Sequence, residues 1–201
     1  MVGSHPGQVR DILDKVEAVA ESDFIRGEIN KVREQIARFE DYITAWEAAG
    51  PYTLDNADLK DLFDAEFPPE QQDADIHWRS IPIGTNTRMP FLIELDKFFG
   101  GDNRVAYLRT NVWSDAAKDA LLEVGSDDGV KVWINGELVH AHHATRPVAP
   151  AQDTVETALQ EGWNAVLMKV TQGGGEWKAC LRFRTPDGGP IEGLRASTTP
   201  N

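Results

Sequence analysis

The chain has 201 residues, which is enough for one sizeable domain plus an appendage and too few for two ordinary domains with independent cores. Hydrophobic residues make up 41% and charged residues 26%, a balance that is typical of soluble globular proteins and excludes wholesale disorder. The formal net charge of -13 repels phosphate backbones and anionic lipid surfaces, so we expect no nucleic-acid partner, whereas neutral polysaccharides and cations such as calcium remain compatible with it.

Apolar residues between positions 9 and 39 recur at spacings of three and four, which is typical of amphipathic helices. Ser22 and Asp23 offer an N-cap before the second run, so we expect two helices or one interrupted helix, roughly over 7–21 and 23–41. Their apolar faces dock on the rest of the chain, belong to an upstream helical array, or bind a partner protein. We assign residues 1–41 to this N-terminal helical segment.

From residue 42 onward the pattern changes to that of β-strands. Residues 42–52 predict a first strand that stops at Gly50 and Pro51, and 54–75 predict a long polar loop anchored by Phe63 and Phe67. Further short strands are expected over 77–83, 91–95, 105–113, 120–126, 130–135, 138–140, 155–159, 163–170 and 177–184. Such spacing without intervening helices indicates a mainly β fold, an antiparallel β-sandwich or jelly roll over 42–195, with a tail at 196–201.

Turn residues and side-chain alternation add detail to two of these strands. Asn135 and Gly136 predict a hairpin turn, because both positions accept positive φ. A period of two predicts these core residues: Val130, Val132, Ile134, Trp177, Ala179, Leu181 and Phe183. The opposite face of the last strand is then a charged outer face formed by Lys178, Cys180, Arg182 and Arg184.

The segment 125–140 carries a resemblance to a known family; it reads Gly-Ser-Asp-Asp-Gly-Val-Lys-Val-Trp-Ile-Asn-Gly-Glu-Leu-Val-His. It resembles the galactose-binding-domain-like sandwiches that are attached to glycoside hydrolases and to large multi-domain bacterial proteins. The stretches 46–52, 160–170 and 173–177 are similar to the same family, so the resemblance covers about 42–195. It implies a carbohydrate-binding module with a β-sandwich fold.

The run from Ser126 to Gly129, Ser-Asp-Asp-Gly, also resembles an element of protective-antigen-type lectin domains, in which paired aspartates hold a calcium ion that chelates sugar hydroxyls. The resemblance implies a calcium-binding role for Asp127 and Asp128. From the residues alone a structural role is equally physical, because an aspartate before glycine hydrogen-bonds its own backbone and shapes the turn.

His140, His142 and His143 follow the predicted hairpin closely. Such imidazoles bind zinc or copper if their rings converge on a third ligand, but on an extended strand His140 and His142 share a face that His143 does not. Hydrogen bonds to sugar hydroxyls are the interpretation we favour for these histidines. The remaining residues assigned to this ligand-binding set are Arg146, Gln152, Asp153 and Gln172.

Six tryptophans offer candidates for a sugar-stacking surface, because the C–H faces of sugars pack on indole rings. Trp46 and Trp177 lie in apolar register and are expected in the core. Trp113 and Trp133 lie on the faces opposite the aliphatic residues of their strands, so we expect them to be the platforms, unless the helices or the long loop cover them.

Enzymatic motifs are absent from the sequence: it contains no nucleophile elbow, no phosphate-binding glycine loop and no His-Glu-x-x-His. Cys180 is the only cysteine, which excludes an internal disulfide framework, and its position inside a strand predicts an inert buried thiol. No run of 18 apolar residues and no signal-peptide core occurs, so we expect no membrane insertion by the chain as given.

The sequence therefore predicts a non-catalytic carbohydrate-binding module, secreted or periplasmic, that targets a larger exported protein to polysaccharide and contacts the other domains of that protein. The alternative is an architectural or protein-interaction sandwich that binds no glycan. Exposure of Trp113 and Trp133 distinguishes the two, because a platform must face solvent. A metal-dependent enzyme requires His140 and His142 to meet a third ligand.

Overall fold

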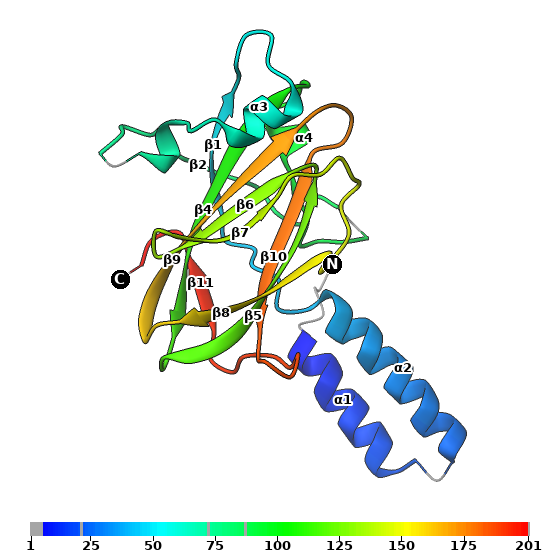
Figure 1. Ribbon diagram of the computed structural model, residues 1–201. Helices are drawn as coiled ribbons and strands as arrows, with labels where there is room; N and C mark the ends of the chain where they lie inside the picture. The colour runs from blue at the N-terminus through cyan, green and yellow to red at the C-terminus, as the bar shows by residue number, and fades with distance from the viewer. Residues whose placement is uncertain (1–5, 21, 72, 87, 201) are drawn as a thin grey trace. The chain divides into compact units, whose positions relative to one another are not determined.

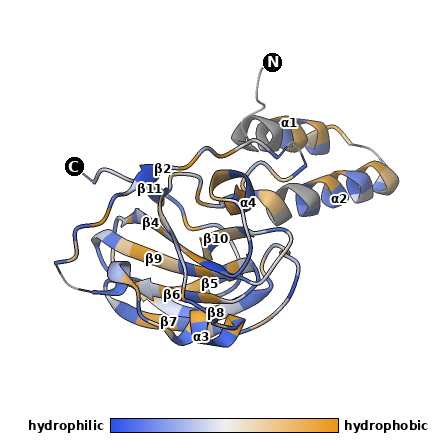
Figure 2. Cartoon of the chain, turned by 90° about the horizontal axis from the view of Figure 1, so that it is seen from above, coloured by the Kyte–Doolittle hydropathy of each residue, from blue (hydrophilic) through white to orange (hydrophobic). Residues whose placement is uncertain are grey.

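The chain divides into two compact units, Met1–Asp41 and Tyr42–Asn201. The computed structural model describes residues 6–20, 22–71, 73–86 and 88–200. The first unit consists of two helices, α1 (Pro6–Ala18) and α2 (Asp23–Phe39), each carrying hydrophobic and hydrophilic residues (Figures 1 and 2). No helix in the described part of the chain has the length and apolar composition that crossing a bilayer requires.

The helical unit confirms the predicted interruption near residue 22. The Ser22 hydroxyl accepts a hydrogen bond of 3.2 Å from the Phe24 amide, so Ser22 caps α2 as expected. Arg33 on α2 joins the two helices, since its guanidinium lies 2.6 Å from Asp14 and 2.7 Å from Glu17 on α1. These pairs are largely exposed, so each contributes little to stability, at most about 1 kcal/mol.

The second unit is an antiparallel β-sandwich, as predicted (Figure 1). Among the described residues, the larger sheet has seven strands in the order β2-β1-β4-β9-β6-β7, with β11 also paired to β4, and the smaller sheet has four in the order β3-β10-β5-β8. The strands of the larger sheet are β1 (Glu47–Tyr52), β2 (Arg79–Ser80), β4 (Arg104–Ser114), β6 (Val130–Ile134), β7 (Glu137–His142), β9 (Gly162–Gln172) and β11 (Arg195–Ser197). Those of the smaller sheet are β3 (Ile93–Glu94), β5 (Lys118–Asp127), β8 (Asp153–Leu159) and β10 (Lys178–Arg184). Short helices α3 (Leu59–Asp64), η1 (Pro68–Glu70) and α4 (Leu95–Phe98) lie in the connections.

The core lies between the two sheets. Val130, Val132 and Ile134 of β6 face Leu181 and Phe183 of β10 within one apolar cluster, and each of the five is at most 4% exposed. Full burial of one such side chain contributes roughly 1.5–3 kcal/mol. Figure 2 shows hydrophobic and hydrophilic residues alternating along the strands, the pattern from which these faces were predicted.

The predicted hairpin joins β6 and β7. Asn135 has φ 53° and Gly136 has φ 84°, so both turn positions lie in the left-handed region that this residue pair favours. β6 pairs with β7 on one side and with β9 on the other, which makes β7 the last strand of the larger sheet.

The expected charged outer face of β10 is wrong: Lys178, Cys180, Arg182 and Arg184 are all at most 9% exposed. Cys180 packs in a second apolar cluster with Tyr42, Phe91 and Leu92. Tyr42 stacks on Phe91 with ring centroids 4.1 Å apart, and the Arg182 guanidinium lies 4.6 Å from the Tyr42 ring centroid. The segments before β1 and β3 thus cover a face that the alternation of β10 alone predicts to be open.

Three element boundaries also differ from the prediction. The first strand begins at Glu47, because the chain before it turns where the Trp46 indole donates to the Ile43 carbonyl. The loop 54–75 contains α3, which starts where the Asp58 carboxylate accepts from the Asp61 amide. At the C-terminus, Ala196 and Ser197 pair with β4 as part of β11 and do not belong to a tail.

Candidate functional site

The outer face of the larger sheet carries a groove of about 530 Å³. β4, β9 and the turn after β6 form its floor, η1 borders it, and residues after β11 complete it. The lining residues that matter for the argument are Glu70, Arg109, Asn111, Trp133 and Leu167. A cleft of this size with one aromatic ring and several polar groups has the composition of small-ligand sites in proteins.

The groove exists because the loop between β1 and β2 covers only part of this sheet face. Leu62 of α3 and Phe67 beside η1 pack on Val105 and Tyr107 of β4, and Trp133 and Leu167 border that cluster. The register places Trp133 opposite Leu167, and Leu167 opposite Arg109, so the three side chains form a row across β6, β9 and β4. Trp133 is half-buried, so part of its indole faces the groove.

Polar side chains along the groove are held in place by their neighbours. The Arg109 guanidinium stacks 4.4 Å from the Trp78 ring centroid and pairs with Glu47 at 2.8 Å. Such fixed side chains lose little conformational freedom when they bind a ligand, which favours affinity.

Residues of β4 and β9 hold the Glu70 side chain in place. Its Oε1 accepts hydrogen bonds from the Tyr107 hydroxyl and from the Lys169 ammonium, the latter at 3.2 Å. Burial, followed by the bond to Glu70, raises the pKa of Tyr107 well above its usual value, so the phenol stays protonated and remains the donor. The carboxylate therefore keeps one orientation at the border of the groove.

Trp113, the other predicted platform, does not line the groove. It is half-buried and meets Trp163 edge-on with ring centroids 5.5 Å apart, while the Arg195 guanidinium lies 5.3 Å from its ring. The larger sheet therefore brings Trp133, and not Trp113, to the groove.

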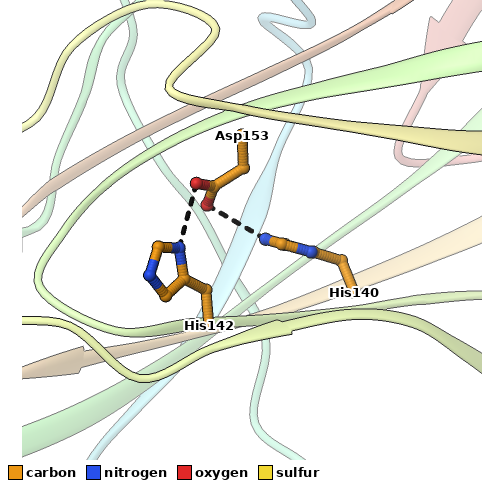
Figure 3. A group of neighbouring side chains, drawn as sticks. All are labelled: His140, His142 and Asp153. Atoms are coloured by element: carbon orange, nitrogen blue, oxygen red, sulfur yellow. Dashed lines mark hydrogen bonds and ion pairs between the residues drawn. The ribbon is translucent and has the colours of Figure 1, made fainter.

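The predicted loop residues gather elsewhere, around the carboxylate of Asp153 at the start of β8. Figure 3 shows His140 and His142, both on β7, converging on it: His140 Nε2 lies 2.9 Å from Oδ2 and His142 Nδ1 lies 3.0 Å from Oδ1. Arg146 makes two further bonds to the same oxygens, of 2.8 and 2.6 Å. Burial raises the pKa of Asp153, but hydrogen bonds from Arg146, His140 and His142 outweigh it and hold the pKa well below its usual range.

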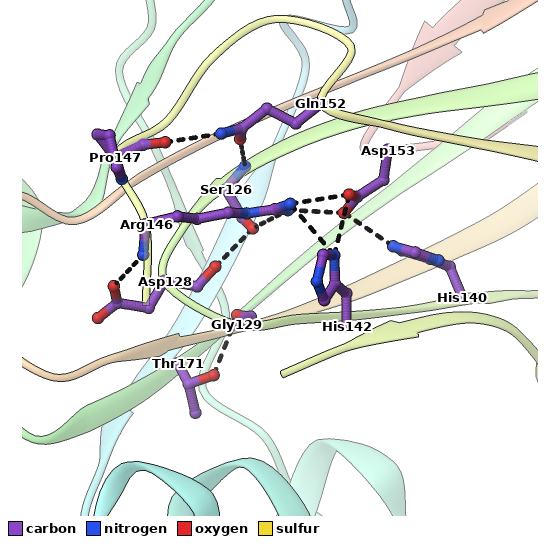
Figure 4. Close-up of polar contacts among 10 residues, drawn as sticks. All are labelled: Ser126, Asp128, Gly129, His140, His142, Arg146, Pro147, Gln152, Asp153 and Thr171. Atoms are coloured by element: carbon purple, nitrogen blue, oxygen red, sulfur yellow. Dashed lines mark hydrogen bonds and ion pairs between the residues drawn. The ribbon is translucent and has the colours of Figure 1, made fainter. Parts of the chain in front are cut away.

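Arg146 also connects this cluster to the Ser-Asp-Asp-Gly turn (Figure 4). Its guanidinium donates to the Ser126 hydroxyl at 2.9 Å, and its amide donates to Asp128 Oδ1 at 3.0 Å. Gln152 accepts from the Ser126 amide at 3.1 Å and donates to the Pro147 carbonyl at 2.7 Å. Most polar atoms that were expected to meet a sugar here thus bond to one another.

Asp127 and Asp128 differ in their surroundings. Both oxygens of Asp128 accept backbone amides, from Arg146 at 3.0 Å and from Gly173 at 2.9 Å. Burial, followed by the charges of Asp128 and Glu176, raises the pKa of Asp127 to about 6. The negative charge of Asp127 is therefore only partly compensated.

The carboxylate oxygens of Asp127 and Asp128 do not by themselves complete a calcium site. Calcium takes about six to eight oxygen ligands. Within the described residues, one group of three or more His, Cys, Asp or Glu ligand atoms is close enough to share an ion, and it contains neither Asp127 nor Asp128. The calcium-binding role of the pair stays a prediction.

Two other predicted ligand residues lie apart from these clusters. The His143 ring packs edge-on against Phe63 with centroids 5.3 Å apart. It lies on the face of the extended chain opposite to that of His140 and His142. Gln172 is fully buried and donates to the Gly175 carbonyl at 3.2 Å, so its side chain does not reach the surface where a glycan would bind.

Sequence reasoning missed Arg109, Asn111 and Glu70. Arg109 and Asn111 share the outer face of β4 with Trp113, so the same period of two that selected Trp113 signals them. Glu70 has no such signal, because a connection far away in the sequence brings it to the groove.

No family model and no curated protein matches the sequence. Solved structures that resemble the fold include the A domain of epithelial adhesin 9 from Candida glabrata in complex with Galβ1-3GlcNAc (TM-score 0.48, 9% identity, 80% of this chain and 92% of that one). Others are the PA14 domain of the MpAFP antifreeze protein (0.47, 18%, 76% and 89%) and an anti-sigma factor domain-containing protein (0.44, 14%, 78% and 45%).

This chain thus spans less than half of the anti-sigma factor domain-containing protein, and it spans 16% of a β-glucosidase from Kluyveromyces marxianus that is also similar, with a TM-score of 0.43. The sandwich fold itself rests on the strand pairing described above.

Proposed function

We propose that the chain is a non-catalytic carbohydrate-binding module that holds a larger exported protein near a neutral polysaccharide. The observation that carries the proposal is the groove on the larger sheet with the Trp133 indole in its wall. An indole face packs against sugar C–H groups, while rigid polar side chains beside it bond the hydroxyls. Arg109, Asn111 and Glu70 supply these donors and acceptors.

Charge favours a neutral glycan. The net charge of -13 repels uronic-acid polymers and sulfated chains at long range, whereas neutral sugars are unaffected. Burial also raises the pKa of the Cys180 thiol to about 12, so the one cysteine stays protonated and supplies no nucleophile. The inert thiol supports a binding role over a cysteine-dependent catalytic one.

A second hollow of about 540 Å³ lies between β7 and β8. Among its described lining residues are Leu138, Val139, Glu156 and Gln160, and none of the lining residues is aromatic. Without a ring to stack on, a glycan gains less there, so the groove beside Trp133 is the better site.

Affinity electrophoresis tests the proposal directly. The full chain is run in native gels that contain a soluble neutral polysaccharide (galactan, xylan, galactomannan or mixed-linkage β-glucan), with and without chelator. We expect at least one polysaccharide to retard the wild type, and Trp133→Ala to lose most of the retardation, about tenfold or more in affinity, since one lost stacking contact is worth roughly 1.5 kcal/mol.

Trp113→Ala is the matched control, because its indole lies on the same sheet face outside the groove. It should be retarded like the wild type once circular dichroism shows that both variants fold. Equal retardation of the wild type and Trp133→Ala would contradict the proposed site. Loss of retardation in chelator that added calcium, but not zinc, restores would add the Asp127–Asp128 turn to the site.

The helical unit favours a second function, protein interaction. Large apolar side chains on α1 and α2 are at least 40% exposed: Ile12, Val16, Phe24, Ile25 and Val32. Apolar side chains at helical spacing are typical of surfaces that dock on other proteins. Retardation by none of the polysaccharides would favour this interpretation, in which the sandwich is a spacer.

A further inference from the structure

The rings of His140 and His142 converge on one carboxylate, that of Asp153. β7 is the last strand of the larger sheet and β8 the last strand of the smaller one, so the cluster spans the edge where the two sheets meet. His140 and His142 are two positions apart on β7 and point the same way (Figure 3). Asp153, the first residue of β8, meets both rings.

We propose that His140, His142 and Asp153 form a binding site for one divalent transition-metal ion, with Zn²⁺ as the best match. Imidazole nitrogens and carboxylate oxygens are the ligands that zinc prefers when cysteine is absent. The ligand atoms of the three residues all lie within 4.8 Å of one another. Ligand atoms around a tetrahedral zinc are about 3.3 Å apart. The His–Asp contacts of 2.9 and 3.0 Å, which reach the two different oxygens of Asp153, need to widen only slightly to admit the ion.

Access and burial suit such a site. The Asp153 and His140 side chains are 9% and 14% exposed, which fixes two ligands in place, while the His142 side chain is 44% exposed and leaves a path for the ion. Three protein ligands leave the fourth position of a tetrahedral ion to water or to another ligand.

Arg146 is the group that competes with the ion. Its guanidinium bonds both oxygens of Asp153, and its NH1 lies 3.2 Å from His142 Nδ1 (Figure 4). A carboxylate offers about four acceptor positions, so Arg146 can release Oδ1 and His142 while its NH2 keeps Oδ2 at 2.6 Å and Ser126 at 2.9 Å. In the bound state the positive charge of Arg146 then remains beside the ion and weakens its affinity.

This competition makes the proposal distinguishable from a purely structural ion-pair cluster. A purely structural cluster becomes less stable when Arg146 is removed, and it binds no metal ion with or without Arg146. A metal site binds the ion more tightly without Arg146, because a like charge beside the ion has been removed.

The test is isothermal titration of the full chain, freed of metal by chelator and dialysis, with zinc chloride at neutral pH. We expect one Zn²⁺ per wild-type chain, at least about tenfold weaker binding in His142→Ala, and tighter binding than wild type in Arg146→Gln. His143→Ala is the matched control, because this neighbouring histidine packs on Phe63 and should leave the affinity unchanged.

His142 is exposed, so its substitution should not impair folding, and circular dichroism of each variant checks this. Binding of Co²⁺ provides a second readout, since a tetrahedral site gives cobalt an intense visible absorption that His142→Ala should abolish. Absence of binding in both the wild type and Arg146→Gln would overturn the proposal, as would equal affinities of the wild type and His142→Ala.

Discussion

One buried lysine on the outer face of the larger sheet determines how that face is covered. Lys169 on β9 is fully buried, and its ammonium donates to the carbonyls of Phe63 and Ala65 and to the Glu70 carboxylate. Burial lowers the pKa of Lys169, and the nearby Glu70 charge opposes that shift. One side chain thus fastens α3 and η1 over part of the sheet and leaves the groove open beside them.

The raised pKa of Asp127 predicts how the stability of the chain depends on pH. Burial and the neighbouring carboxylates raise its folded-state pKa to about 6, above the unfolded value near 3.8. Between these two values the folded chain holds a proton that the unfolded chain releases, so the contribution of Asp127 to stability falls as the pH rises from about 4 to 6. Asp127→Asn should remove this decline and raise the thermal midpoint at pH 7.

Thermal unfolding of both chains across that pH range measures the effect. Asp119→Asn serves as the control, because Asp119 is an exposed aspartate on the same strand. A wild type and an Asp127→Asn variant with parallel stability curves between about pH 4 and 6 would show that Asp127 is not perturbed.

At the scale of elements, turn chemistry decides where strands reverse. Gly136 has φ 84°, and a Cβ added there meets no atom within 4 Å, so the cost of a side chain is purely conformational. Gly125 on β5 differs, because an added Cβ would lie 2.1 Å from the Ala149 carbonyl oxygen and 2.9 Å from the Cys180 sulfur. Replacing glycine by alanine therefore has a conformational cost at Gly136 and a steric cost at Gly125.

We expect Gly136→Ala to lower the free energy of unfolding by about 1 kcal/mol, and Gly125→Ala to lower it by more, since backbone must move to make room. Urea unfolding monitored by tryptophan fluorescence measures both. Equal losses in the two variants would contradict this distinction between conformational and steric cost.

Elements with local signals were predictable from the sequence, and those that depend on distant packing were not. The Asn135–Gly136 turn, the Ser22 cap and the core positions of β6 follow from spacing and residue type alone. The covered face of β10 does not, because the alternation of β10 does not reveal that Tyr42 and Phe91 pack on it from the segments before β1 and β3.

The candidate sites divide in the same way. Trp133 was predictable as an outward-facing indole, and His140 with His142 as a pair on one strand face. That Asp153 joins the two histidines, and that Arg146 occupies the same carboxylate, depends on how the edges of the two sheets meet, which strand periodicity does not specify.

At the scale of the whole molecule, the sandwich presents its groove on the outer face of the larger sheet, in a chain of net charge -13. Four tryptophans report three different environments: Trp133 lies in the groove wall, Trp113 and Trp163 contact each other, and Trp177 lies in the core. The chain therefore contains its own set of local reporters for ligand binding.

The most direct test of the glycan site is heteronuclear NMR of the tryptophan indole N–H groups during titration with oligosaccharides from the polysaccharide that retards the chain, or from the four-polysaccharide panel if none does. The resonance of Trp133, assigned with Trp133→Phe, should shift in a saturable way, whereas those of Trp46 and Trp177, both at most 2% exposed, should stay in place. A Trp133 resonance that stays unchanged at saturating sugar would contradict the account.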